Sequence, residues 1–449
     1  MPPSTKNHSS NWAVVHCAHG HAGPTEAAYV LNPHNLSIEA PSMPVMRPII
    51  SSCQRVHLGW LIPTTLLATT ALVIGCQRSD SPPPTGTACL PGSPVAKQCQ
   101  NITITRNPFY PGSQSPQLTV QAFDPTFEAI VGRTPQLVPL ATGFGFTEGP
   151  VYLKDRQGQG GLLFITDQIH NSIYSMRWNG LTNGQITTDS WEKPKLFRNP
   201  SGVADGQTPD LQGHLLTAET TGRRVSITRN IEANLKSPAP QAPSLVDRYQ
   251  GKRLNSPNDL VVKSDGTIWF TDPSYGSLQF PPQPAELPNN VYRFDPKNKQ
   301  LTVVAPGLVM PNGIAFGPGE KTLYIIDSGA IQGPRTYFPY LPHRIYVYNV
   351  AGDGKTLTNK RLFANVAPGF PDGMRLDNKG NVYVGTLEGI HVLNAKGKLI
   401  GKFLMAKQTA NLSFGGSDNN ILFIGSSNSL WAVKLNTRGL VPVRTRSEP

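Results

Sequence analysis

One short pattern recurs six times between residues 162 and 426 of this 449-residue chain. Each copy has three or four apolar or β-branched residues followed by a polar one, and the copies read LLFITD, LLTAE, IWFTD, LYIID, VYVGT and LFIGS. The copies end at intervals of 52, 53, 55, 59 and 40 residues, at Asp167, Glu219, Asp272, Asp327, Thr386 and Ser426. A repeat of this length built from short strands is typical of a four-stranded blade. Six copies therefore predict an all-β, six-bladed β-propeller.

The closure of the ring is indicated by the length of the last interval, which is the shortest. Residues 126–146 contain further strand-forming runs, so we expect one end of the chain to supply the outer strand of the last blade. Closure of this kind leaves no exposed strand edge. The 42 Gly and 43 Pro residues, with only 15% charged residues, favour many short strands joined by tight turns. The propeller is predicted over residues 126–440, with a tail at 441–449.

The basic charge of the chain does not form a nucleic-acid footprint. The formal net charge is +12, but the lysines and arginines are scattered, with no block of five or more like charges and no basic helix. We therefore expect no nucleic-acid partner. All five cysteines lie in the first 99 residues, which excludes a cysteine nucleophile or a thiolate-bound metal in the repeat region.

The segment from Met46 to Cys76 has the features of an export signal. Arg47 and Arg55 precede an apolar stretch over residues 58–75, and Cys76 follows it to complete the sequence VIGC at 73–76. VIGC resembles the bacterial lipobox, in which the cysteine, here Cys76, is lipidated. We therefore expect residues 46–76 to be a lipoprotein-type signal peptide of an exported bacterial lipoprotein. It would be anchored to a membrane through its lipid, on the periplasmic side or at the cell surface. The alternative is an uncleaved transmembrane anchor, because 18 residues reach the lower limit for a span.

The residues on either side of this signal are interpreted from it. A signal must lie near the amino terminus, so we expect translation to start at Met46 or Met43. Residues 1–45 are then disordered or a mis-assigned start. Residues 77–125 form a linker rich in Pro, Gly and Ser. An exported linker favours a local disulfide between Cys89 and Cys99, and the alternative is two free thiols.

A second element precedes each repeat, and it places polar residues at the start of an apolar strand. The six copies read TEGPVYL, SGVAD, SPNDLVV, MPNGIAF, PDGMRLD and ANLSF. In a propeller this element forms the innermost strand of its blade, so the six strand starts face one another across one opening. Their polar residues are Glu148, Ser201, Asn258, Asp259, Asn312, Asp372 and Asn411.

Four of these positions predict a site for a hard cation. Glu148 and Asp372 offer carboxylate oxygens, and Asn258 and Asn312 offer amide oxygens, which are the ligands that Ca²⁺ prefers. Any one of them alone is explained as a turn residue, because Asn, Asp and Gly are common in turns. Four in matching positions of different repeats favour a shared site over four separate turns.

The run GKRLNSPNDLVVKSDGTIWFTDPSYG, at residues 251–276, closely resembles the gluconolactonase branch of the senescence-marker/regucalcin/gluconolactonase family. The segments EGP at 148–150, PNG at 311–313 and PDGM at 371–374 are similar to that family's other motifs in order and spacing. The resemblance covers about residues 140–435. It implies a propeller that uses a divalent metal to hydrolyse a sugar-type lactone or a similar small-molecule ester.

The resemblance also implies a role for each matching residue. Glu148, Asn312 and Asp372 match metal ligands, and Asp372 also matches the catalytic acid/base. Asn258 matches a substrate-contacting or auxiliary metal-ligand position. The expected metal is Ca²⁺, with Zn²⁺, Mn²⁺ and Mg²⁺ as alternatives. Where many gluconolactonases read similar to CEHG, this chain has AETTG at residues 218–222, so a histidine near the second blade is missing and the substrate can differ.

Two other functions use the same scaffold. One is a binding propeller that is stabilised by Ca²⁺ and performs no turnover, because structural and catalytic calcium ions use the same oxygen ligands. The other is hydrolysis of aryl esters or phosphotriesters. A serine hydrolase is disfavoured, because the chain has no G-x-S-x-G nucleophile elbow.

The export interpretation predicts that lipidation depends on the thiol of Cys76. Replacing Cys76→Ala should abolish metabolic labelling with a radioactive fatty acid and should release the protein or stall its precursor. Membrane retention of the variant with an uncleaved amino terminus would instead support a transmembrane anchor.

Overall fold

The computed structural model describes residues 119–441 apart from short gaps at 134, 156–157, 159, 238–241, 280–283 and 334–335. Four short strands before residue 119 are also described: β1 (Val14–His16), β2 (Ala28–Leu31), β3 (Ile38–Glu39) and β4 (Thr105–Arg106). Residues 1–77 are a separate unit, in which β1, β2 and β3 pair antiparallel. The predicted lipidation site Cys76 and the predicted Cys89–Cys99 disulfide lie outside the described residues.

The described helices include none with the length and apolar character needed to cross a membrane.

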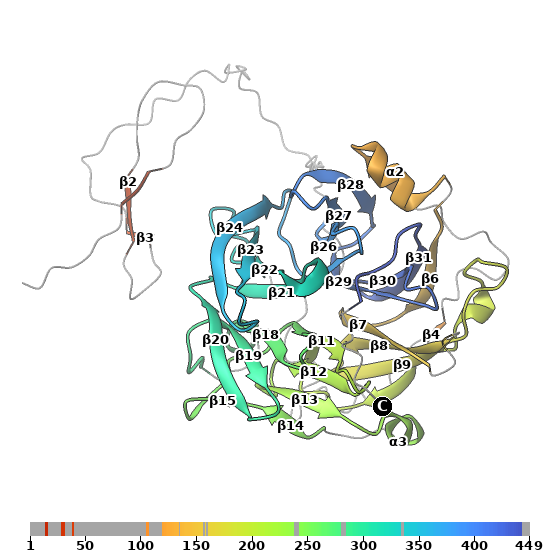
Figure 1. Ribbon diagram of the computed structural model, residues 1–449, viewed down its shortest axis with the longest axis horizontal. Helices are drawn as coiled ribbons and strands as arrows, with labels where there is room; N and C mark the ends of the chain where they lie inside the picture. The colour runs from red at the N-terminus through yellow and green to blue at the C-terminus, as the bar shows by residue number, and fades with distance from the viewer. Residues whose placement is uncertain are drawn as a thin grey trace, which may run out of the picture. The chain divides into compact units, whose positions relative to one another are not determined.

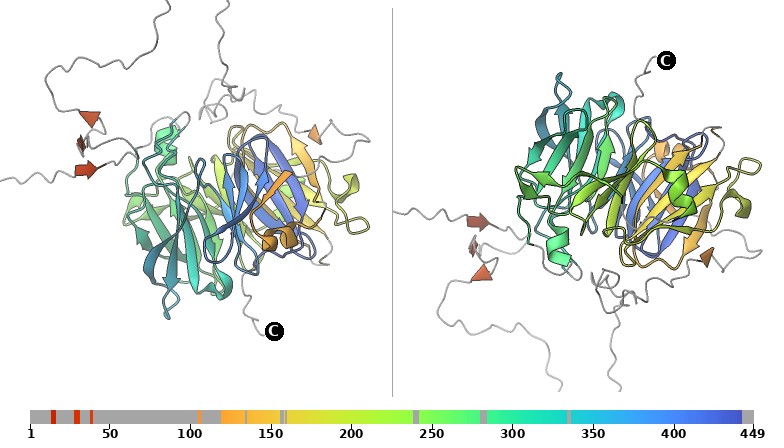
Figure 2. Two further views of the ribbon diagram at one scale, coloured as in Figure 1. Left: turned by 90° about the horizontal axis from the view of Figure 1, so that it is seen from above. Right: turned by 90° about the horizontal axis from the view of Figure 1, so that it is seen from below.

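Six antiparallel sheets surround a central axis, which Figure 1 views end on. Figure 2 shows the same blades from the side. The prediction of an all-β, six-bladed propeller is confirmed. The innermost strands, in blade order, are β7 (Thr147–Lys154), β11 (Ala204–Pro209), β17 (Leu260–Val262), β21 (Pro311–Phe316), β25 (Met374–Leu376) and β29 (Thr409–Gly415).

The second strand of every blade is one of the six sequence repeats. These strands are β8 (Gly161–Asp167), β12 (Leu215–Glu219), β18 (Ile268–Asp272), β22 (Thr322–Asp327), β26 (Val382–Thr386) and β30 (Ile421–Ser426). The third strands are β9 (Ser172–Trp178), β13 (Arg224–Thr228), β19 (Asn290–Asp295), β23 (Arg344–Val350), β27 (Gly389–Leu393) and β31 (Ser429–Lys434). The fourth strands of blades one to five are β10 (Lys195–Arg198), β14 (Ser244–Val246), β20 (Gln300–Pro306), β24 (Leu357–Asn365) and β28 (Leu399–Leu404).

A few short elements lie outside this pattern. β15 (Arg248–Tyr249) and β16 (Lys252–Arg253) form a hairpin between blades two and three. The remaining helical segments are α2 (Pro125–Val131), α3 (Ile231–Lys236), α4 (Tyr275–Gln279) and the 3₁₀ turns η1 (Thr188–Ser190) and η2 (Pro318–Glu320).

The ring closes through a strand from the amino-terminal side of the propeller. β6 (Leu137–Thr142) pairs with β31 and is the fourth strand of blade six, as the short last interval predicts. Two more strands lie upstream of residue 126, where the sequence analysis placed the start of the propeller. β5 (Thr119–Ala122) extends blade five and β4 extends blade six. Both pair with an outer strand, so they cover edges that would otherwise be open.

Large aromatic side chains fill the space between neighbouring blades. The ring centroids of Trp178 in blade one and Phe423 in blade six are 5.1 Å apart in an edge-to-face arrangement. Trp269 in blade three and Phe316 in blade four are 5.4 Å apart in the same way. Such pairs add to the hydrophobic energy of burial, and here they join consecutive sheets.

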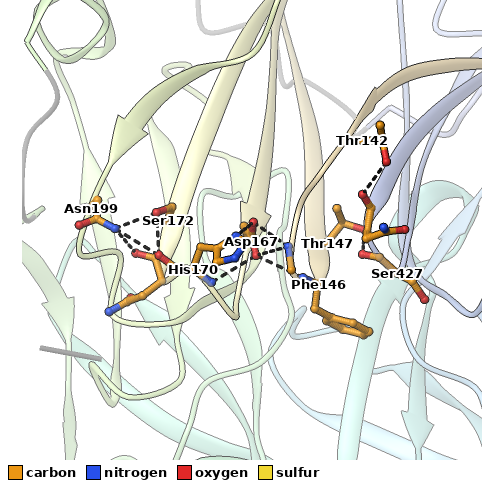
Figure 3. A network of polar contacts seen from close by, with 11 residues as sticks. Thr142, Phe146, Thr147, Asp167, His170, Ser172, Asn199 and Ser427 are labelled. Carbon is orange, nitrogen blue, oxygen red and sulfur yellow. Dashed lines mark hydrogen bonds and ion pairs between the residues drawn. The ribbon is translucent and has the colours of Figure 1, made fainter. Parts of the chain in front are cut away.

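The polar residue that ends the second strand holds the start of the inner strand. In blade one, Asp167 accepts hydrogen bonds from the backbone N–H of Gly145, at 3.0 and 3.1 Å, and of Phe146, at 3.2 Å. His170 Nδ1 lies 2.7 Å from the same carboxylate (Figure 3). Because these N–H groups belong to the segment that leads into β7, the Asp167 carboxylate fixes the position of Glu148.

Asp272 and Asp327 make the same contacts in blades three and four. Each accepts two hydrogen bonds of 2.8–3.1 Å from consecutive backbone N–H groups, those of Asn255 and Ser256 and those of Val309 and Met310. A buried backbone N–H needs an acceptor, and bonds to carboxylates are stronger than bonds to neutral oxygens. The repeated aspartates are therefore structural, and they hold the backbone in place just before each inner strand begins.

The other three blades end the second strand differently. Glu219 in blade two forms ion pairs with Arg198 at 3.3 Å and Arg224 at 2.6 Å. Burial lowers the pKa of Arg198 to about 10, although Glu219 opposes this shift. In blades five and six, the hydroxyl groups of Thr386 and Ser426 donate to backbone carbonyls.

These contacts predict that Asp327→Asn destabilises the propeller. Asparagine keeps one acceptor oxygen but turns an amide donor towards a backbone N–H, so one of the two bonds is lost in a buried place. We expect the free energy of unfolding to fall by about 1–3 kcal/mol, measured by chemical denaturation.

A matched control is Asp353→Asn. The Asp353 carboxylate also accepts from two backbone N–H groups, those of Lys355 and Thr356, but in an exposed turn. Water can replace the lost bond there, so we expect a smaller loss than for Asp327→Asn. Equal losses would contradict a special role for the buried carboxylate.

Candidate functional site

The structure brings the four sequence-predicted residues together at the starts of inner strands. Glu148 lies in β7 and Asn312 in β21, while Asn258 and Asp372 come just before β17 and β25. Asn312 Nδ2 donates to Asp372 Oδ1 at 2.8 Å, which joins blades four and five. Glu148, Asn258 and Asn312 are buried, whereas Asp372 is partly exposed.

A fifth residue, Asp205 of β11, completes the cluster and was not among the predicted site residues. Its Oδ2 accepts from Asn258 Nδ2 at 2.8 Å and from Gln168 Nε2 at 2.9 Å. The sequence analysis selected Ser201 from the same segment, SGVAD. The structure places Ser201 in the preceding loop instead, where its backbone N–H and its hydroxyl both lie 3.1 Å from Asn171 Oδ1.

A signal for Asp205 is present in the sequence. In four blades the inward polar residue is followed directly by glycine, in the pairs Glu148-Gly149, Asp205-Gly206, Asn312-Gly313 and Asp372-Gly373. A Cβ on Gly149, which has a φ of +44°, would lie 2.1 Å from the backbone oxygen of Asp205. Glycine is required because the inner strand of the next blade lies against it.

Two of the same glycines also donate backbone hydrogen bonds to the next blade. The N–H of Gly206 donates to the carbonyl of Asn258 at 2.7 Å. The N–H of Gly313 donates in the same way to Asp372, at 3.0 Å. The inward polar residues of neighbouring blades are therefore held side by side by backbone contacts, and not only by their own side chains.

Three further side chains touch the cluster. Gln408 Nε2 donates to Asp372 Oδ2 at 3.2 Å, and the hydroxyl of Tyr275 in α4 lies 3.5 Å from Asn312 Nδ2. The Asn411 side chain of blade six packs directly against Gly373. A Cβ added to that glycine would lie 2.3 Å from Asn411 Cγ.

An ion pair spans the central channel. Asp259 follows Asn258 in blade three, and its Oδ2 lies 3.1 Å from Arg375 Nη1 in blade five. Blade four lies between these two blades in the ring, so the pair crosses the channel. Asp259 is fully buried, and Arg375 balances its charge.

The other three carboxylates of the cluster, two of them buried and that of Asp372 partly exposed, have no such partner among the described residues. Burial raises the pKa of Glu148 well above its ordinary value, and the nearby carboxylates of Asp205 and Asp372 raise it further. The pKa of Asp205 is raised by burial and then by Asp372 and Asp259. Burial also raises the pKa of Asp372 to about 7, although hydrogen bonds from Asn312 and Gln408 lower it. Within the described residues, no lysine, arginine or histidine forms an ion pair with Glu148, Asp205 or Asp372.

This arrangement fits a bound cation. The oxygens of Glu148, Asp372 and Asn312 are hard ligands of the kind that Ca²⁺ binds. A bound cation would supply the positive charge that balances these carboxylates. The Asn312 amide turns Nδ2 towards Asp372. With a cation between the two side chains, rotation of the amide by half a turn would present its oxygen to the cation. No three carboxylate, imidazole or thiolate groups of the described chain converge as a ready metal site.

Comparison with known proteins identifies the family. Residues 146–428, more than half of the chain, match the family model described as SMP-30/Gluconolactonase/LRE-like region. The chain belongs to this family. The resemblance inferred from residues 251–276 and the shorter motifs is confirmed.

Relatives and solved structures agree with this assignment. A gluconolactonase of Zymomonas mobilis is 28% identical over 341 residues, which cover 71% of this chain and 87% of that protein. A lactonohydrolase of Aspergillus oryzae is 31% identical over 202 residues, or 42% of this chain and 44% of that protein. The structure of a gluconolactonase from Xanthomonas campestris superposes with a TM-score of 0.59 at 28% identity, over 72% of this chain and 98% of that one.

The raised pKa of Asp372 predicts how the stability of the metal-free protein depends on pH. A carboxyl group whose pKa is higher in the folded than in the unfolded chain contributes stability at low pH. That contribution is lost as the pH rises through the folded-state pKa, which is about 7 for Asp372. In chelator, the melting temperature should fall as the pH rises from about 4 to about 7, and this contribution should level off above that pH. The fall should be smaller for Asp372→Asn, which has no carboxyl group to ionise, as measured by thermal unfolding.

The control for this measurement is Asp353→Asn. Local hydrogen bonds, chiefly from Thr356, lower the pKa of Asp353 to about 2, so its contribution changes only at much lower pH. Its pH profile between about pH 5 and about pH 8 should match the wild type. A profile for Asp372→Asn that is parallel to the wild type would refute the raised pKa.

Proposed function

We propose that this protein hydrolyses a sugar-type lactone with the help of a divalent metal. The observation that carries the proposal is the convergence of Glu148, Asn312 and Asp372 at the start of three inner strands of a propeller. Clustered carboxylates that have no paired cation favour the binding of a metal cation. The match to gluconolactonases over more than two thirds of the chain supports lactone hydrolysis as the reaction.

Glu148, Asn312 and Asp372 are the residues that would hold the metal. We expect Ca²⁺, and Zn²⁺, Mn²⁺ or Mg²⁺ are the alternatives with oxygen ligands. When bound, a divalent ion polarises a carbonyl group and lowers the pKa of water. Gln408 helps to orient the ligand set, because it donates to the Asp372 oxygen that Asn312 does not contact.

Asp372 is the proposed acid/base. It is the one carboxylate of the cluster that is partly exposed, so it can contact both a water molecule and a substrate. Its carboxylate takes a proton from the attacking water and returns it to the ring oxygen as the C–O bond breaks. A lactone suits this site, because the leaving alcohol stays tethered to the acyl group and needs no pocket of its own.

We also propose that the enzyme acts outside the cytoplasm. The lipobox-like VIGC at residues 73–76 supports lipidation of Cys76. The Pro-rich segment between Cys76 and β4 would tether the propeller to the membrane.

The proposed roles predict different effects of two isosteric substitutions. Asp372→Asn keeps an oxygen that can bind metal but has no group that can accept a proton, so kcat should fall roughly 10²–10⁴-fold. Glu148→Gln weakens a ligand only. Raised metal concentration should therefore restore much of the activity of Glu148→Gln and little of that of Asp372→Asn. The measurement is initial-rate kinetics on gluconolactone over a Ca²⁺ titration.

Two outcomes would contradict the proposal. Equal rescue of both variants by metal would remove Asp372 from the chemistry. A wild-type protein that binds Ca²⁺ but hydrolyses no compound in a panel of lactones, aryl esters and phosphotriesters would be a binding propeller.

A further inference from the structure

Asp205 has one carboxylate oxygen that nothing in the site uses. Both of its hydrogen bonds, from Gln168 and Asn258, are accepted by Oδ2. Oδ1 accepts no hydrogen bond from any residue that the structure describes. The two amide donors orient the carboxylate, so Oδ1 has a defined direction within the cluster of Glu148, Asp372 and Asp205.

Asn258 carries a second unused acceptor beside it. Its side chain belongs to a residue that is 6% exposed, and Oδ1 is a buried oxygen with no hydrogen-bond partner among the described groups. The amide is not free to rotate, because exchanging its nitrogen and oxygen would set an oxygen against the Asp205 carboxylate. A buried polar atom without a hydrogen-bond partner lowers the stability of the fold. A ligand that donates hydrogen bonds to these two oxygens would therefore be bound favourably.

The donor is not the proposed metal acting on all three carboxylates. No three carboxylate, imidazole or thiolate groups of the described chain converge on one point. The proposed metal ligands are Glu148, Asn312 and Asp372, and of the two roles of Asn258 we assign it the contact with the substrate. The donor is not Arg375 either, because that side chain is paired with Asp259 at 3.1 Å. Water can donate to these two oxygens until a ligand with donors of its own displaces it. The donors on a sugar-type lactone are its hydroxyl groups.

We propose that Asp205, oriented by Gln168 and paired with Asn258, binds the hydroxyl groups of the substrate and so selects a neutral, polyhydroxylated lactone. This inference rests on the proposed lactone hydrolysis. The site contains three carboxyl groups that form no ion pair with a described side chain. With all three ionised, one divalent metal leaves the site negative. A phosphorylated or otherwise anionic lactone would be repelled. A lactone without hydroxyl groups would leave Asp205 Oδ1 and Asn258 Oδ1 unpaired, which is how polar sites reject analogues.

The first arm of the test compares three lactones. These are glucono-δ-lactone, δ-valerolactone, which has no hydroxyl groups, and 6-phosphoglucono-δ-lactone. For the wild type, we expect kcat/KM to be highest for the neutral hydroxylated compound. Asp205→Asn is isosteric but turns the free acceptor into a donor and removes a charge. It should lower the ratio of kcat/KM for glucono-δ-lactone to that for δ-valerolactone about 10-fold or more. It should also improve the relative rate on the phosphorylated compound.

The second arm measures binding without turnover. Isothermal titration with gluconolactam, in which NH replaces the ring oxygen, should show about 10-fold or more weaker binding to Asp205→Asn. The dissociation constant for Ca²⁺ should change far less than it does in Glu148→Gln. Asp205→Ala serves as a second variant if the asparagine substitution perturbs folding, and Asp353→Asn, in an exposed turn, is the matched control for removing one carboxylate.

The outcomes separate this inference from the proposed function. Equal losses on glucono-δ-lactone and δ-valerolactone, or a loss of Ca²⁺ affinity as large as in Glu148→Gln, would make Asp205 a metal ligand or a structural residue. Either result, or lactam binding that does not depend on Asp205, would overturn the inference. A wild type that hydrolyses no lactone but binds gluconolactam through Asp205 would refute the proposed reaction and leave the hydroxyl-binding role standing.

Discussion

The inner strands of neighbouring blades approach so closely that only glycine fits at the point of contact. At Gly149 and Gly206, a Cβ would lie 2.1 and 2.5 Å from atoms of the next blade. The N–H of Gly206 uses this closeness to bond with the carbonyl of Asn258. The residue before each of these glycines is therefore held next to its counterpart in the following blade. The ring and the site are consequences of the same contact, because packing the inner strands side by side also gathers their polar side chains.

The acidic residues near the centre of the propeller have two different roles, one structural and one in the candidate site. Asp167, Asp272 and Asp327 sit at the ends of the second strands, where they accept hydrogen bonds from buried backbone N–H groups. They complete the fold. Glu148 and Asp372 instead lie at the starts of inner strands and have no cationic partner among the described residues, and burial raises their pKa. Such an arrangement lowers stability, which is common where a protein prepares a binding or catalytic site.

The local sequence determined much of this. The repeat of an apolar run and a final polar residue predicted strands, their number and the six blades, because strand pattern and turn residues are local properties. The short last interval predicted that an outer strand comes from elsewhere in the chain, and β6 fills that place. The run at residues 251–276 was specific enough to indicate the family. Glu148, Asn258, Asn312 and Asp372 were found because each begins an apolar strand at a matching position.

Tertiary structure decided what depends on register and on contacts between blades. Ser201 and Asp205 are both polar residues of one short segment. Only the hydrogen bonds that Asp205 accepts from Asn258 and Gln168 show that it is the residue in the cluster. The strand β5 lies upstream of the predicted boundary, because its sequence has no repeat signal and its place comes from pairing with β28. The burial of these carboxylates, the absence of an ion-pair partner among the described side chains and the raised pKa of Asp372 likewise depend on several blades. The sequence by itself determined which residues could form a site, whereas their common environment exists only after six separate segments have closed into a ring.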